Sequence, residues 1–280
     1  MKIEYFDIHS HLYFPDFDED RNEEIERTKK AGIAVINIGT DIKTSRECVR
    51  LANEHKNLFA CIGQHPGDLT VDSVFDEHLT KLALEEKVVA IGECGLDYFR
   101  LPENEEDVLK IKMIQKTIFE YHVDLALTVD KPLMLHIRSS KGTQDAYLDA
   151  LTILEHHQKT SGGKLKGNAH FFAGDLNILK RFLDIGFTVS FTGVITFTND
   201  YNELIKSTPI DMIMVETDAP FVAPVPHRGK RNSPMYIPDI VKKMAEIKGE
   251  SEENMKKALF DNVLKRFPKI KESLASFGLL

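Results

Sequence analysis

The sequence predicts an α/β protein built as a single (β/α)8 barrel, and three observations support this fold. Eight short apolar runs alternate with longer amphipathic segments along the 280 residues. Strands that alternate with helices form parallel sheets from βαβ units. The length suits one barrel of about 250 residues, and no tandem repeat or Gly/Ser linker divides the chain. A doubly wound sheet usually needs fewer strands, so we expect one barrel domain over residues 1–280.

The expected strands are short and rich in Val, Ile, Leu or Phe. They are residues 3–8, 33–38, 58–63, 88–92, 132–137, 167–172, 187–191 and 213–216. The expected helices carry apolar residues at helical spacing, with charged residues between them. They are residues 20–31, 45–55, 74–86, 105–128, 143–160 and 176–185. The first of these ends just before Gly32, and glycine commonly follows the last turn of a helix.

Composition and charge narrow the class of protein. With 42% hydrophobic and 29% charged residues, the chain falls in the globular range and outside the disordered, collagenous and disulfide-rich classes. Its 36 basic and 44 acidic residues give a net charge of −8, which mildly disfavours a general binder of nucleic acids or anionic membranes. A bound metal or a local basic patch would reverse that expectation at a site.

The cysteines and the N-terminus indicate the compartment. Cys48, Cys61 and Cys94 are an odd number without C-x-x-C spacing, which predicts neither a disulfide framework nor a cysteine zinc site. The N-terminal residues lack the pattern of a secretory signal, and no apolar run approaches the length of a membrane span. We expect a cytoplasmic protein without a membrane segment or an obligate protein partner.

Side chains that commonly bind metals gather at the ends of the expected strands, where a (β/α)8 barrel carries its chemistry. They are His9, His11, His65, Glu93, His136, His170 and Asp218. A single histidine at a strand end is more often a structural residue, but five of the 11 histidines lie at such positions. His9 and His11 are two residues apart, so both can face the barrel axis and hold one ion. The pattern predicts a metal site at the mouth of the barrel.

Seven motifs follow one another along the chain. They are DIHSH at 7–11, GQHP at 63–66, GECGLD at 92–97, HIR at 136–138, HFFAG at 170–174, ETDAP at 216–220 and HRGKRN at 227–232. Together they resemble the TatD family of metal-dependent hydrolases, within the amidohydrolase-like barrels. The resemblance covers residues 3 to about 267 and is specific, because seven weak motifs occur in the same order. Gly67, Ile137 and Phe171 depart from the family pattern without removing an expected ligand, and this bears on substrate preference.

The resemblance implies a centre with two divalent metal ions. One ion would be bound by His9, His11 and Asp218 and the other by His136 and His170, with Glu93 as the bridge between them. Four imidazoles and two carboxylates suit Zn, Mn, Fe or Ni better than a pure Mg site, although the family is commonly described as Mg-dependent. Asp218 and Glu93 are also the catalytic candidates, and Asp218 would orient the attacking water and accept its proton.

The segment after Asp218 is expected to contact the substrate. Residues 219–238 contain five of the 11 prolines and no acidic residue, which predicts an extended loop over the mouth. Its cations suit phosphate oxygens. The expected substrate-binding residues are His65, Arg138, His227, Arg228, Lys230 and Arg231. The seven acids of residues 16–26 are expected to lie away from the mouth.

These features predict a phosphodiesterase acting on DNA ends. By resemblance, it is a TatD-type deoxyribonuclease with 3′–5′ exonuclease action on single-stranded ends. The residues themselves support only two-metal hydrolysis of an anionic substrate. One alternative is hydrolysis of an amide or ester, including deacylation of D-aminoacyl-tRNA. Another is a non-catalytic nucleic-acid-binding protein, which the intact ligand set disfavours.

Overall fold

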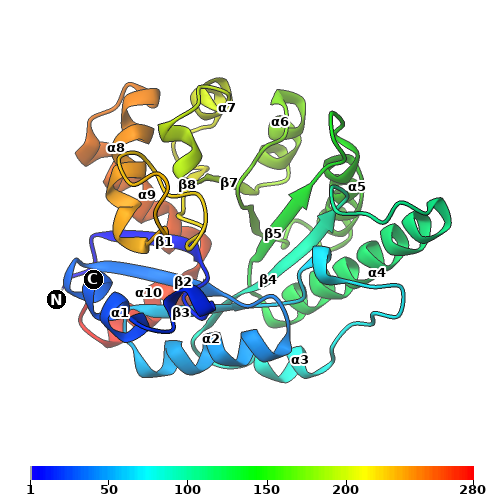
Figure 1. The fold of residues 1–280 in the computed structure, drawn as a ribbon, viewed down its shortest axis with the longest axis horizontal. Coiled ribbons are helices and arrows are strands. Elements are labelled where there is room, and N and C mark those ends of the chain that lie inside the picture. Colours follow the sequence, from blue (N-terminus) through cyan, green and yellow to red (C-terminus); the bar gives the residue numbers. More distant parts are fainter. Residues whose placement is uncertain (1) are drawn as a thin grey trace.

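The computed structural model describes residues 2–280 and contains one eight-stranded parallel sheet, in which the strands follow one another in chain order (Figure 1). A further parallel bridge joins Ser10, at the end of the first strand, to Ala219, after the last. The sheet is therefore a nearly closed barrel, and the predicted fold is confirmed. Its strands are β1 (Tyr5–Ser10), β2 (Ile33–Ile38), β3 (Leu58–Ile62), β4 (Val88–Asp97), β5 (Leu133–Arg138), β6 (Gly167–Ala169), β7 (Thr188–Phe191) and β8 (Ile213–Val215).

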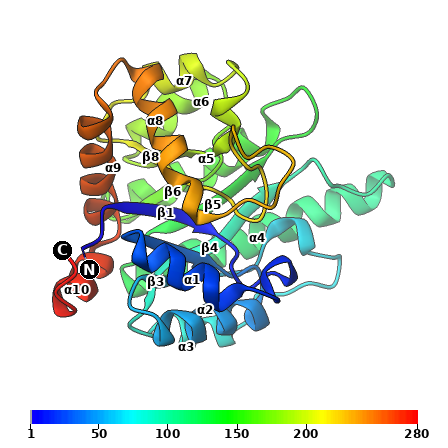
Figure 2. The ribbon, with the colours of Figure 1, turned by 60° about the vertical axis from the view of Figure 1, so that its left-hand side comes forward.

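The helices surround the barrel (Figures 1 and 2). They are α1 (Arg21–Lys30), α2 (Ile42–Glu54), α3 (His78–Leu82), α4 (Glu105–Val129), α5 (Asp145–Thr160), α6 (Leu176–Asp184), α7 (Asn202–Ser207), α8 (Ile237–Lys248), α9 (Glu252–Arg266) and α10 (Pro268–Ser276). Among residues 2–280, no helix is both long and apolar enough to cross a membrane.

Two features of the helices differ from the expectation. The segment before α3 is not helical, because the Gln64 side chain binds it, donating to the Val74 carbonyl and accepting from the Asp76 N–H. Helices α7 to α10 fall outside the six expected segments. Helix α8 begins inside the expected proline-rich loop, and Pro238 lies in its first turn, where a missing N–H costs no helical hydrogen bond.

The strands are buried on both faces, as a parallel sheet with helices outside requires. Alternate residues of β2 show this, since Val35 packs with the surrounding helices and Ile36 faces a second apolar cluster. That second cluster also contains Phe267, between α9 and α10, and Ile270 of α10. Apolar packing therefore fills the barrel below its mouth, and polar side chains gather at the carboxyl ends of the strands.

Candidate metal centre

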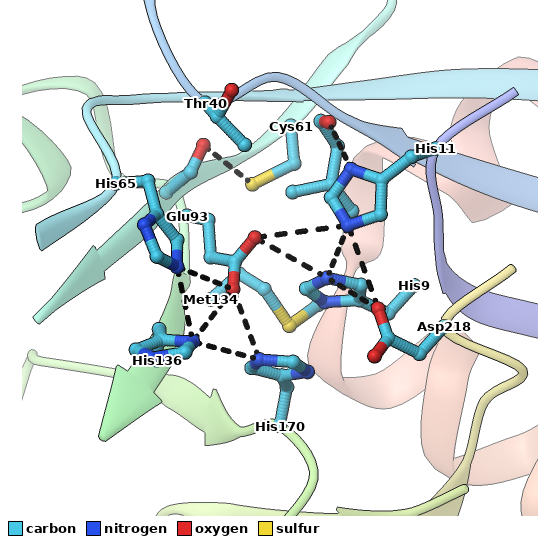
Figure 3. Close-up of polar contacts among 12 residues, drawn as sticks. His9, His11, Thr40, Cys61, His65, Glu93, Met134, His136, His170 and Asp218 are labelled. Atoms are coloured by element: carbon cyan, nitrogen blue, oxygen red, sulfur yellow. Dashed lines mark hydrogen bonds and ion pairs between the residues drawn. The ribbon is translucent and has the colours of Figure 1, made fainter. Parts of the chain in front are cut away.

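Six side chains from β1, β4, β5 and the segments after β1, β6 and β8 converge at the carboxyl ends of the strands (Figure 3). They are His9, His11, Glu93, His136, His170 and Asp218, the six residues that sequence reasoning expects as ligands. The Nε2 atoms of His9 and His11 lie 3.3 Å apart, as their spacing of two residues predicts.

Glu93 reaches the centre of the cluster because β4 is bulged. Ile91 pairs with Leu133 and Cys94 with Leu135, so β4 advances three residues where β5 advances two. Gly92 has a φ of 145°, and a Cβ there would lie 2.2 Å from the Met134 carbonyl oxygen. Only glycine fits this position. The expected strand ended at Gly92, whereas the structure continues it to Asp97 and places Glu93 inside the strand.

The two carboxylate oxygens of Glu93 face different halves of the cluster. Oε1 lies 2.9 Å from His136 Nδ1 and 3.0 Å from His170 Nε2. Oε2 lies 3.5 Å from His9 Nε2 and 3.8 Å from His11 Nε2. Asp218 Oδ1 completes the second half, 3.5 Å from His11 Nε2 and 3.8 Å from His9 Nε2. Glu93 thus has the geometry of a carboxylate shared between two ligand sets.

In three of these histidines, the ring nitrogen that points away from the cluster lies beside a hydrogen-bond acceptor, and this determines which nitrogen presents a lone pair to the cluster. Their outer nitrogens face acceptors and so carry the proton. His11 Nδ1 lies 2.9 Å from the Ile38 carbonyl oxygen, His136 Nε2 lies 3.2 Å from Asp97 Oδ2, and His170 Nδ1 lies 3.3 Å from Glu216 Oε1. The inward nitrogens then present lone pairs around two carboxylates. A set made only of acceptors fits divalent cations.

Asp97 and Glu216 have roles that the sequence reasoning does not assign. Each carboxylate is buried behind a ligand histidine and fixes the orientation of its ring. Glu216 also accepts from the Ser190 hydroxyl (2.9 Å) and the Phe171 N–H (2.7 Å). Asp97 belongs to the GECGLD motif and Glu216 to the ETDAP motif. Their places in the same motifs as the expected ligands Glu93 and Asp218 could have indicated a role at the site.

The carboxylates and imidazoles shift one another's pKa. Burial alone would raise the pKa of Glu93, but His65, His9 and His170 outweigh it and hold that pKa well below its usual value. Burial alone would lower the pKa of His170, but Glu216 and Glu93 hold it well above the usual value. Without ions, protons on the histidines would balance the buried negative charge.

We expect the metal-free protein to lose stability as the pH rises above about 6.5, the usual histidine pKa. The folded-state pKa values of His11, His136 and His170 are raised, because neighbouring carboxylates outweigh burial. Their contribution is therefore complete below the unfolded-state pKa and lost as the pH rises through the folded-state values. His9, whose pKa burial lowers, acts in the opposite direction. The depressed pKa of Glu93 contributes stability at pH values above the unfolded-state pKa of this carboxyl group, and this contribution is lost in acid.

Thermal unfolding of EDTA-treated protein measures this dependence, and maximum stability should fall between roughly pH 5 and 7. Adding Mn²⁺ at pH 8.5 should restore the lost stability, because cations replace the protons and bind deprotonated ligands best. A metal-free Tm that rises steadily up to pH 9 would contradict the electrostatic balance described above.

His65 lies against this cluster, but its hydrogen bonds give it a different chemistry. The Gly67 N–H donates to His65 Nδ1 (3.1 Å), which occupies that lone pair. Burial, followed by the neighbouring His136, lowers the pKa of His65 to about 3, so the ring is neutral and carries its proton on Nε2. His65 Nε2 lies 3.6 Å from Glu93 Oε1. His65 lies close enough to Glu93 and His136 to share an ion with them, but with the proton on Nε2 the ring presents an N–H donor to the site.

A cavity of about 750 Å³ lies over the cluster. Arg100, Arg138 and Lys141 line the side formed by the segments after β4 and β5. The Arg138 guanidinium lies 3.9 Å from the centroid of the Phe99 ring. Among residues 2–280, neither Arg138 nor Lys141 has a carboxylate within 4.0 Å. These two cations are therefore available to an anionic ligand.

The basic residues of the loop after β8 lie elsewhere, in contrast to the expectation that they cover the mouth. The cavity is not lined by His227, Arg228, Lys230 or Arg231. Both terminal nitrogens of Arg231 bind the Asp20 carboxylate at 2.7 Å. Arg228 stacks on Phe197 (3.9 Å), and His227 stacks on Tyr236 (3.6 Å). The acidic segment 16–26, expected away from the mouth, contributes no residue to the cavity lining, and through Asp20 it neutralises one of the loop's cations.

Comparisons with known proteins agree with this geometry. The family model described as TatD related DNase matches residues 6–268. The uncharacterized metal-dependent hydrolase YcfH of Escherichia coli (strain K12) is 37% identical over 220 residues, which cover 78% of this chain and 76% of that protein. The uncharacterized metal-dependent hydrolase YabD of Bacillus subtilis (strain 168) is 33% identical over 267 residues, covering 94% and 98%.

A solved structure extends the agreement to three dimensions. YjjV, a TatD homolog from Escherichia coli k12, superposes with a TM-score of 0.80 at 25% identity, covering 96% of this chain and 99% of that one. The family model spans most of the sequence, and both curated relatives exceed 30% identity over more than two thirds of the chain. The chain therefore belongs to the TatD family of metal-dependent hydrolases.

Proposed function

We propose that the protein is a deoxyribonuclease that removes nucleotides from single-stranded DNA ends in the 3′–5′ direction, using two divalent ions of the Mg, Mn or Zn class. The supporting observation is the position of Glu93, whose Oε1 lies 3.0 Å from His170 and whose Oε2 lies 3.5 Å from His9. A carboxylate between two ligand sets suits a pair of ions, and pairs of ions a few Å apart serve in-line phosphoryl displacement. The description of the matched family supports the choice of DNA.

The proposed roles follow from the charges and hydrogen-bonding atoms. When bound, the two ions supply positive charge that polarises a phosphoryl oxygen and acidifies a water. Burial alone would raise the pKa of Asp218, but the hydrogen bond from His11 and the nearby histidines lower it. Asp218 therefore stays ionised and accepts the proton of the attacking water. His65 Nε2–H donates to a phosphoryl oxygen, and Arg138 and Lys141 contact the neighbouring phosphates.

The proposed site differs from the expected set in its cations. Lys141 is added because it lines the cavity. His227, Arg228, Lys230 and Arg231 are left out because none of them does. We also propose a cytosolic location, which is supported by three cysteines that are all buried and unpaired.

A substrate panel tests the function. The purified protein, with Mg²⁺ or Mn²⁺, should release mononucleotides from 5′-labelled single-stranded DNA and shorten it from the 3′ end. RNA, a p-nitrophenyl phosphodiester, a lactone and a D-aminoacyl-tRNA complete the panel. The His136→Ala variant should lose the activity with DNA, because it removes a ligand. Faster turnover of the lactone or the aminoacyl-tRNA than of DNA would replace the nuclease assignment with the amide and ester alternative.

We expect the double variant Arg138→Ala, Lys141→Ala to bind single-stranded DNA more weakly and with a shallower dependence on salt. Each lost phosphate contact reduces the slope of log K against log salt by about 0.7, so two contacts reduce it by about 1.4. Fluorescence anisotropy between 50 and 300 mM KCl measures the slope. Arg231→Ala is the matched control, because Asp20 already neutralises that cation. An unchanged slope in the double variant would remove both cations from the binding site.

A further inference from the structure

We propose that Phe221 is the stacking surface for a nucleobase next to the scissile phosphate, an inference that rests on the proposed action on nucleic acid. Phe221 lines the cavity, and the residue is 48% exposed. A phenyl ring left in solvent loses the stabilisation that burial gives an apolar side chain. Exposed aromatic rings beside a cationic groove are how proteins hold single strands without reading sequence, because every base has a π face.

The ring is fixed in position relative to the metal ligands. The Phe221 N–H donates to the carbonyl of the ligand Asp218 (2.8 Å), which closes a tight turn. The side chain of Asn232, buried under this turn, donates to the carbonyls of Phe221 (2.5 Å) and Thr217 (2.7 Å). Hydrogen bonds within the protein therefore fix the position of Phe221, which follows the expected ligand Asp218 by three residues, and they do not depend on the substrate.

Neighbouring rings support Phe221 from one side. Phe14 meets it at 85° with centroids 5.6 Å apart, and the ligand His11 lies 6.4 Å away at 66°. Phe14 in turn packs against His11, with centroids 5.0 Å apart. This aromatic group, made of His11, Phe14 and Phe221, joins the stacking surface directly to the half of the cluster that His9, His11 and Asp218 form.

Two other phenylalanines are also exposed, Phe99 in the cavity lining and Phe197 outside it, and each has a cation over its face. Arg138 lies over Phe99 and Arg228 over Phe197, each at 3.9 Å from the ring centroid. In the described part of the chain, residues 2–280, no cation lies over the Phe221 ring. Of these three rings, Phe221 is the one that combines a position in the cavity with a face free of cations.

The two sides of the cavity match the two parts of a nucleotide. The segments after β1 and β8 supply Phe14 and Phe221, whereas β5 and the segments after β4 and β5 supply the cations, together with Phe99. A base on Phe221 leaves the sugar–phosphate chain to run over the metal cluster toward Arg138 and Lys141.

A tryptophan at position 221 gives a direct readout, because the chain contains no other tryptophan. In Phe221→Trp, a hexathymidylate with phosphorothioate linkages, which resist hydrolysis, should quench the fluorescence as it binds. Two further oligonucleotides carry an abasic residue, one at the terminal position and the other at the penultimate position. One of these two should bind without quenching the fluorescence, because it lacks the base that stacks on residue 221. Phe197→Trp is the matched control, since Phe197 is 41% exposed and lies outside the cavity lining, and it should not be quenched.

Kinetics separates stacking from simple space filling. Phe221→Ala and Phe221→Leu should both raise KM for single-stranded DNA, by about 5- to 150-fold, and Phe221→Tyr should restore it. An abasic substrate should show little difference between these variants. Equal effects on normal and abasic substrates, or hydrolysis without quenching of Phe221→Trp, would overturn the stacking role. Quenching without any hydrolysis of DNA would support the base site and overturn the nuclease assignment, so the two failures are distinguishable.

Discussion

Glu93→Gln should abolish the proposed hydrolysis and weaken the binding of both proposed ions together. The substitution keeps the size of the side chain but removes the charge that lies 2.9 Å from His136 and 3.5 Å from His9. Because one carboxylate faces both ligand sets, neither set keeps its full complement. Metal ions contribute several kcal/mol of transition-state charge stabilisation. Since 1.36 kcal/mol corresponds to a factor of ten, kcat/KM should fall by at least about 10³-fold.

Elemental analysis after dialysis, together with titration by Mn²⁺, measures the ion content of Glu93→Gln. The matched control is Glu24→Gln, which changes another buried glutamate outside the cluster, and it should keep both metal content and activity. A Glu93→Gln protein that binds one ion as tightly as the wild type would show that Glu93 serves one ligand set and is not shared.

Asp218→Asn should lower kcat by about 10² to 10⁴-fold, the usual contribution of a positioned general base. Asp218 has a φ of 55°, a left-handed conformation that asparagine tolerates well, so this variant should fold where alanine would be strained. The amide keeps an oxygen for the His9 and His11 set but cannot accept a proton. Single-turnover kinetics with saturating Mn²⁺ separates this loss from weaker metal binding.

Asp68→Asn is the control for Asp218→Asn, because Asp68 is an exposed carboxylate that lines the same cavity. It should change kcat by less than about threefold, since surface charges away from the reacting atoms contribute little. If saturating Mn²⁺ fully restores kcat in Asp218→Asn, Asp218 is a ligand without a role in proton transfer.

The convergence of the expected ligand residues could be predicted because it depends on short-range rules. Strand spacing places His9 and His11 together, and the carboxyl ends of parallel strands always meet at one face of a barrel. The packing that turns Glu93 inward was less accessible, because it needs the bulge and the close approach of Gly92 to Met134. The sequence shows glycine there but not the neighbouring strand that requires it.

The cationic side of the cavity could not be predicted from local charge. Residues 219–238 lack acids, yet Arg231 is neutralised by Asp20, 211 positions earlier in the chain. Arg138 was expected to contact the substrate and Lys141 was not, and only the fold shows that both line the cavity. Local composition describes a segment, whereas the availability of a cation depends on which distant side chain packs against it.

The bulge in β4 makes the site sensitive to the number of residues in the strand as well as to their identity. Without Gly92, β4 would advance two residues where β5 advances two, so the bulge would disappear and the side chains of β4 would alternate regularly. Because side chains on a strand alternate between faces, a shift of one position turns each of them to the opposite side. Insertions or deletions in residues 91–94 should therefore be tolerated far less than in the surface turn at Gly162 and Gly163, where an added Cβ meets nothing within 4 Å.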